Sequence, residues 1–268
     1  MTRPNRRSTL AKWSLAAAVF VTAGCEASRP PADNQAAPGN AVAAPTPAPI
    51  PAPEPPLDRE RLLLAVAQAR SAYAAGVDDR PAQAELEGDR FELRIRFGCG
   101  APPAEAAGNP SVRHDTGART IELNAAADVD LADPPVAAVA GEGVEAVEGI
   151  WIPLPWLLRP ACVPGTTMAT HQVGIAQYFT PTDSRVGRRG DRSYRHVIRL
   201  ADGQDPARPQ GYDLIVTGRL RAGPAGRVIR CTSTDPNAIP VCLVGAEFER
   251  VRIEDVERAA TLADWSRG

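Results

Sequence analysis

Alternating hydrophobic and polar positions predict β-strands over most of the chain beyond residue 90. In FELRIRF (91–97) every second residue is apolar, and the residues between are Glu or Arg. This is the pattern of a strand with one buried face. VCLVGAEFERVRI (241–253) has the same period, but its apolar parity shifts between Phe248 and Val251, so we expect a β-bulge there. Further segments with this period are 112–125, with two strands around a turn, and 173–179, 193–200, 212–220 and 227–231.

Two helices are predicted at the ends of this β-rich region. The helix over 57–76 can be capped by Asp58 and ended by Gly76 in a left-handed turn. One face of this helix is apolar and carries Leu62, Val66, Ala69 and Tyr73. A short helix from Glu254 to Trp265 is expected to close the chain. Residues 125–150 are rich in Ala, Val and Gly, and their pattern assigns no element.

These elements indicate a mainly β fold. Eight or more strands, mostly in antiparallel hairpins, with one N-terminal helix and a short C-terminal helix, are typical of an antiparallel β-sandwich or a partly closed barrel. Residues 57–268 are numerous enough to bury one sizeable core. We therefore expect a single globular domain over 57–268.

The first 25 residues have the features of an export signal. Four cations within 3–12 precede an apolar run over 13–23, which is too short to span roughly 30 Å of hydrocarbon but suits a signal peptide. The run ends in VTAGC and resembles the lipobox of bacterial lipoproteins, although Thr22 stands where that family prefers Leu. The resemblance implies that residues 1–24 are removed and that a lipidated Cys25 becomes the mature N-terminus.

A lipidated Cys25 would hold the protein on a membrane of the bacterial envelope, because two or more buried acyl chains give stable anchoring. In enteric lipoproteins an Asp after the Cys retains the protein at the inner membrane. By analogy, Glu26 favours the outer membrane.

The segment after Cys25 is predicted to be a disordered tether, so that the lipidated Cys and its tether comprise 25–56. Ten of the residues in 26–56 are proline and none is aromatic, so this stretch cannot bury enough apolar surface to fold. Such a segment favours an extended conformation and reaches at most about 100 Å.

The charge of the mature chain limits its partners. The whole chain carries a formal charge of −2, and removal of the four signal-peptide cations leaves −6. A mildly acidic chain argues against general nucleic-acid binding, which relies on a basic surface. No later stretch approaches about 18 apolar residues, so no further membrane span is expected.

Four cysteines remain in the expected domain, and an even number in an exported protein indicates disulfides. Ten residues, two of them proline, separate Cys231 from Cys242, and we expect this pair to close a hairpin loop. That leaves Cys99 to pair with Cys162. A zinc site is the alternative, but no CxxC or CxxH motif supports it.

The segment GIWIPLPWLLRPAC (149–162) carries almost no charge and two of the four tryptophans. Its three prolines exclude a helix interior or a central strand, so we expect an edge strand that becomes extended and is tied down at Cys162. Two interpretations remain open. The segment caps the sandwich and buries both indoles, or Trp151 and Trp156 form a partner surface, since aromatic residues are enriched at interfaces.

Arginine is concentrated in DSRVGRRGDRSYRHVIR (183–199). Guanidinium groups suit phosphate and carboxylate ligands, so this hairpin is a candidate site for lipid A phosphates or peptidoglycan carboxylates. The alternative is a solvated hairpin tip. The candidate anion-binding residues are Arg185, Arg188, Arg189, Arg192 and Arg195.

The sequence offers little catalytic chemistry. It contains no HExxH, GxSxG or P-loop motif, and its only lysine, Lys12, belongs to the signal peptide. If the strands on either side of the Thr180–Asp191 loop pair with each other, His171 and His196 lie about 13 Å apart, too far to share a metal. His114 adjoins a turn. We therefore expect no catalytic residue, no metal and no cofactor.

These observations lead to one leading functional hypothesis and two alternatives. The leading hypothesis is a membrane-anchored envelope lipoprotein whose domain is a non-enzymatic binding or structural module for an envelope protein or glycan. The first alternative is a binder of anionic glycolipid or peptidoglycan groups through the Arg-rich hairpin. The second is an envelope hydrolase centred on a histidine.

Overall fold

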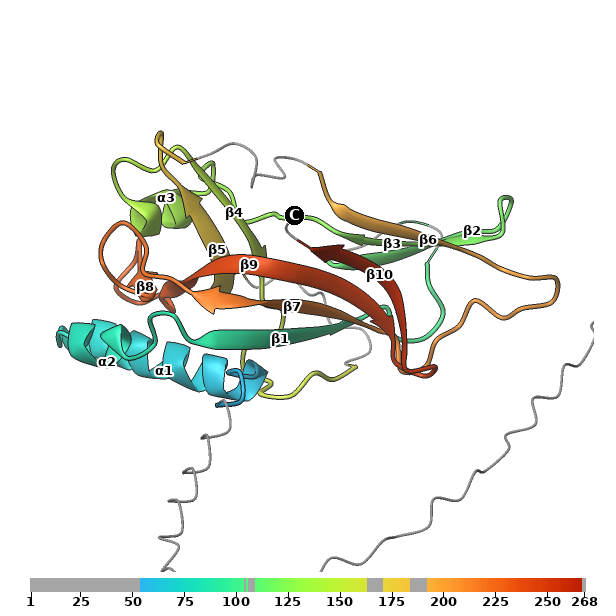
Figure 1. The fold of residues 1–268 in the computed structure, drawn as a ribbon, viewed down its shortest axis with the longest axis horizontal. Helices are drawn as coiled ribbons and strands as arrows, with labels where there is room; N and C mark the ends of the chain where they lie inside the picture. The colour runs from blue at the N-terminus through green and yellow to red at the C-terminus, as the bar shows by residue number, and fades with distance from the viewer. Residues whose placement is uncertain (1–53, 104, 106–108, 163–170, 184–191, 267–268) are drawn as a thin grey trace, which may run out of the picture. The chain divides into compact units, whose positions relative to one another are not determined.

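The central strand of the larger of two sheets is β9 (Val241–Asp255). The computed structural model describes residues 54–103, 105, 109–162, 171–183 and 192–266. Along one side of β9 lie β7 (Tyr212–Leu220) and β8 (Ile229–Thr232), and along the other lie β5 (Val173–Phe179) and β10 (Ala260–Ser266) (Figure 1). The sheet is completed by β1 (Arg90–Phe97) beyond β7 and β4 (Ala146–Trp151) beyond β5. All of these pairings are antiparallel except that of β5 with β9.

The predicted bulge in the long strand is confirmed. The register of β7 against β9 shifts between Thr217 and Gly218, which face Arg250 and Phe248 and leave Glu249 extra. A Cβ on Gly218 would lie 2.0 Å from the carbonyl oxygen of Glu247, so the close approach beside the bulge requires glycine. Phe248 and Arg250 are two positions apart and would share a face in a regular strand. Because of the extra residue, Phe248 is buried on the inner face whereas Arg250 lies on the outer face.

A second sheet and a helix cover the inner face of the large sheet. The second sheet is antiparallel and consists of β2 (Ser111–Asp115), β3 (Thr120–Ala125) and β6 (Tyr194–Arg199). Side chains of both sheets and of α1 (Arg59–Ala75) form one buried cluster. As predicted, Asp58 caps α1, since its carboxylate accepts from the N–H of Arg61, and Gly76 ends the helix with a φ of 65°.

A smaller core lies on the outer face, at the end of the sheet formed by β4 and β5. There α3 (Pro134–Ala140) buries Val136 and Val139 against Val147, Trp151 and Leu243. One further short helix, α2 (Arg80–Ala84), follows α1. The remaining outer face, over β1, β7, the second half of β9 and β10, is lined by charged side chains.

The predicted fold class is confirmed. The domain is mainly β, and its two sheets share a core in the manner of a sandwich. Among the described strands neither sheet closes into a barrel. Residues 125–150, which had no predicted element, contain α3 and all of β4 except its last residue.

The predicted C-terminal helix from Glu254 to Trp265 is wrong. β9 continues to Asp255, a turn follows, and β10 pairs back along β9. The alanines of this segment suit a helix, but the open edge of β9 offers backbone hydrogen bonds over 250–255. That pairing outweighs the local helix propensity.

The assumed pairing of the two strands beside the Thr180–Asp191 loop is also wrong. β5 pairs with β4 and β9 in the large sheet, whereas β6 pairs with β3 in the second sheet. The loop therefore connects two layers. Strand alternation describes which face of a strand is buried, but it carries no information about the neighbouring strand.

Candidate functional site

The two tryptophans of the proline-rich segment have opposite environments. Trp151 ends β4, is 4% exposed and belongs to the smaller core. Trp156 is 58% exposed, and Leu158 nearby is 37% exposed. Trp151 is therefore not part of an accessible partner surface, and the alternative in which both indoles are buried is also wrong. β4 is an edge strand of the large sheet, as predicted for this segment.

A buried arginine from the first turn of α1 holds the exposed segment in place. The Arg59 side chain donates to the carbonyl oxygens of Pro153 (2.8 Å), Leu154 (3.1 Å) and Leu157 (2.9 Å). Burial lowers the pKa of Arg59 to about 10, and the backbone dipoles of these carbonyls stabilise its charge. Trp156 therefore projects from a segment that is fixed at its base.

The disulfides hold the same segment and a second loop. Cys99 pairs with Cys162 at a Cα–Cα distance of 5.8 Å, and Cys231 pairs with Cys242 at 4.0 Å. Both pairings are those predicted. The second bond joins directly opposite residues of β8 and β9. The lipidation residue Cys25 lies outside the described residues.

Only part of the predicted arginine site lies within the described chain. Arg185, Arg188 and Arg189 lie outside the described residues. Arg195 on β6 is exposed and pairs with Glu122 of β3 at 2.6 Å. Arg192 also has an interaction partner.

Glu122 pairs with two arginines beside the described end of this arginine-rich segment, which is a connection between the two sheets and not the predicted hairpin. Its carboxylate accepts a hydrogen bond from Arg195 and another from Arg113 of β2. These bonds lower the pKa of Glu122, and the bond from Arg195 has the larger effect. Arg195 is therefore already engaged by an acid within the domain.

The three histidines occupy separate places. His171 lies just before β5 and stacks on the indole of Trp151, with 4.8 Å between ring centroids. His196 lies opposite Leu123 on β6, where burial lowers its pKa. His114 lies on β2 opposite Ile121. Within the described residues, no group of three or more His, Cys, Asp or Glu could hold a metal ion.

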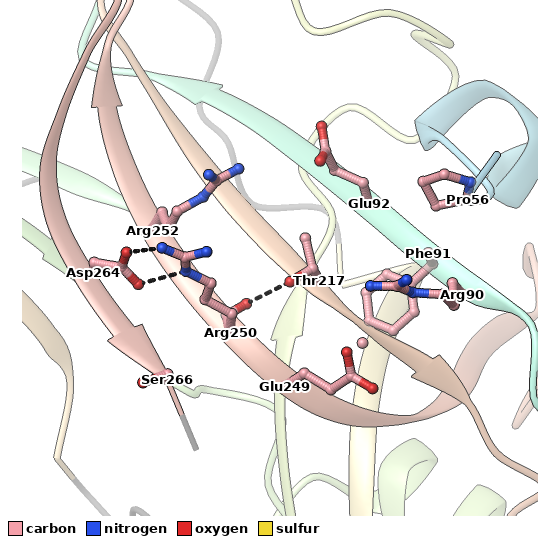
Figure 2. Close-up of a pocket in the computed structure, with 11 residues that line it drawn as sticks. Pro56, Arg90, Phe91, Glu92, Thr217, Glu249, Arg250, Arg252, Asp264 and Ser266 are labelled. Carbon is pink, nitrogen blue, oxygen red and sulfur yellow. Dashed lines mark hydrogen bonds and ion pairs between the residues drawn. The ribbon is translucent and has the colours of Figure 1, made fainter. Parts of the chain in front are cut away.

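A groove that the sequence did not indicate crosses the charged outer face of the large sheet. It is an open groove of about 540 Å³ and is lined by residues of β1, β7, β9 and β10. Thr217 of β7 lies between Arg90 and Glu92 of β1 on one side and Arg252 of β9 and Asp264 of β10 on the other (Figure 2). This volume is within the range of about 300–1,000 Å³ that is typical of small-molecule sites.

The acids that line this groove are all paired. Arg250 donates to Asp264 through its Nε at 2.8 Å and through a second N–H. These hydrogen bonds are the main reason why the pKa of Asp264 is lowered. The other two pairs are Arg219 with Glu249 at 3.2 Å and Arg94 with Glu92 at 2.8 Å. The groove is thus a polar site with fixed ion pairs along its walls.

The pattern of charged residues in the sequence does not indicate this groove. The outward positions of FELRIRF and of FERVRI (248–253) are visibly charged, but charged outward positions are typical of any solvated sheet face. The one sequence feature that could have pointed to a site here was the parity shift at Phe248, because bulges are over-represented beside functional sites. It could not show which strand lies opposite.

Comparisons of the chain with models of protein families, with curated proteins and with solved structures find no match. Among the helices of the described residues, none is long and apolar enough to cross a membrane.

Proposed function

We propose that this protein is a lipid-anchored module of the bacterial cell envelope that docks an envelope protein through Trp156 and Leu158. Cys25 is its lipidation residue, the outer membrane is its location, and residues 26–56 are the tether between lipid and domain. In this proposal the domain is a binding module and performs no chemistry.

The exposure of Trp156 on a fixed segment is the observation that supports this proposal most strongly. The indole is 58% exposed although the segment is held by Arg59 and by the Cys99–Cys162 bond. Arg159 follows within the same segment, and its side chain is 89% exposed. Tryptophan and arginine dominate the energetics of protein interfaces, and a segment whose backbone is already held loses little backbone entropy on binding.

Photocrosslinking in intact cells tests the docking surface. A photoreactive amino acid in place of Leu158 should capture one predominant envelope protein, and Trp156→Ala should reduce that adduct at least tenfold. Ile239→Ala is the matched control, because Ile239 is an apolar side chain with the same 58% exposure on another loop, and it should leave the adduct unchanged. An adduct of equal yield in Trp156→Ala, or only scattered neighbours in every sample, would contradict the docking proposal.

Fractionation of the same cells tests the lipid anchor separately. The parent chain should sediment with the membranes and incorporate labelled palmitate. Cys25→Ser removes the thiol that would carry the acyl chains, and it should release the protein into the soluble envelope fraction or leave its signal peptide uncleaved without label. A Cys25→Ser chain that still incorporates palmitate would rule out this residue as the lipidation site.

A further inference from the structure

Among the described residues, two arginines of the groove make no hydrogen bond to an acid. The Arg90 guanidinium makes no hydrogen bond or ion pair within the described residues. Arg252 lies opposite Asp264, which Arg250 already binds, and it approaches Glu254 at 3.6 Å, but its buried Nε has no hydrogen-bond partner in the described part of the chain. A buried unpaired donor costs free energy. The site therefore presents cationic donors, whereas its three acids are already paired.

These two arginines lie on opposite sides of the groove. Figure 2 shows Arg252 and Arg90 on opposite sides of Thr217. Their strands, β9 and β1, are separated by β7, which places them about 10 Å apart by the usual spacing of strands. The register offsets them further, because Arg252 faces Ile215 whereas Arg90 faces Arg219. A ligand that contacts both must be elongated.

We propose that this groove binds a short peptide with two carboxylates, one held by Arg252 and the other by Arg90. Guanidinium groups bind carboxylates through paired, charge-assisted hydrogen bonds. The remaining lining suits a peptide better than a compact anion. The hydroxyls of Thr217 and Ser266 can bond to amide groups, and the paired carboxylates of Glu92 and Asp264 limit the positive potential that would favour a compact phosphate.

The identity of the peptide rests on the proposed function, whereas the groove itself does not. In a protein held in the bacterial envelope, the abundant short peptide with several carboxylates and an amine is the stem peptide of the cell wall. We assign the groove to that peptide. The site is independent of Trp156, so failure of the docking proposal leaves this assignment open to its own test.

Calorimetry on the full-length chain in detergent micelles tests the assignment with three probes. The probes are the tetrapeptide L-Ala-γ-D-Glu-meso-diaminopimelate-D-Ala, tetra-L-glutamate and inorganic phosphate. The stem tetrapeptide should bind with the highest affinity, and its affinity should fall as salt is added, because exposed charge pairs are screened. Tighter binding of tetra-L-glutamate would overturn the cell-wall source. Phosphate binding as tight as that of the peptides would overturn the peptide assignment.

Single substitutions locate the binding in the groove. Arg252→Gln and Arg90→Gln should each weaken binding of the stem tetrapeptide at least tenfold. Arg119→Gln is the matched control, since Arg119 pairs with the exposed Asp202 outside the groove, and it should bind like the parent chain. Thermal unfolding of each variant reports its fold. Binding that survives in both folded groove variants, or no binding of either peptide to the parent chain, would overturn the proposal.

Discussion

Asp255→Ala is expected to lower the free energy of unfolding by about 3–5 kcal/mol, because it leaves a buried arginine without its counter-ion. Asp255 is 0% exposed at the end of β9, and its Oδ2 lies 3.5 Å from Nε of Arg208, which is 5% exposed. Its Oδ1 accepts from the N–H of Arg258 at 3.1 Å and so fixes the turn before β10. The substitution removes both interactions. Urea denaturation at neutral pH measures the loss.

Two companion variants make this prediction specific. Asp202→Ala removes an aspartate that also pairs with an arginine, but its side chain is 99% exposed, so the loss should stay within about 1 kcal/mol. Arg208→Met combined with Asp255→Ala should be less destabilised than Asp255→Ala alone, because no unpaired charge remains buried. Equal stability of the Asp202 and Asp255 variants would show that the buried pair contributes no more than an exposed one.

Replacement of Cys99 and Cys162 by Ser is expected to cost about 4 kcal/mol, since the bond closes a long loop in the unfolded chain. The two residues are 63 positions apart. The matched replacement of Cys231 and Cys242, which are 11 positions apart, should cost only about 3 kcal/mol because the loop is shorter. Denaturation of both double variants beside the oxidised parent chain gives this order.

The effects of the Cys99–Cys162 and Asp255 changes should not be additive. Arg208 exchanges two backbone hydrogen bonds with Gly100, which follows Cys99. A Cβ on Gly211, nearby in the chain, would lie 3.0 Å from the Cys99 sulfur. Because the disulfide and the ion pair share this corner of the domain, a variant that lacks both should show coupling. Strict additivity, or four free thiols in the purified parent chain, would contradict this description.

Local features of the fold were predictable because they depend on residues close together in the chain. Asp58 and Gly76 bound α1 as their chemistry requires, and three of the four residues on its predicted apolar face, Leu62, Val66 and Ala69, are buried. Tyr73 is 42% exposed, and its hydroxyl accepts from the N–H of Ser233. The bulge was visible as a parity shift at Phe248. The cysteine pairs followed from spacing and from an even count.

The candidate sites were predictable only in part. A proline-rich segment with two tryptophans was recognisable, but only the tertiary structure decides that Trp151 is buried in the core beneath α3 and that Trp156 is exposed. Arg59 looked like an ordinary polar residue of a first helical turn, yet it is buried against carbonyls nearly 100 positions away. Such contacts leave no periodic trace in the sequence.

The sequence by itself determined the class of fold, the inward-facing residues of strands with clear alternation such as β1, the pairing of the cysteines and the expectation of a lipid anchor at Cys25. These depend on the period of a strand, on local caps and on short motifs. Only the tertiary structure decided that Glu254–Trp265 forms the end of β9, a turn and most of β10, that β5 and β6 belong to different sheets, and that Arg90 and Arg252 line one groove. The physical reason is that strand pairings and ion pairs join residues that are far apart in the sequence. That choice depends on which backbone edges and charges the folded domain leaves unpaired.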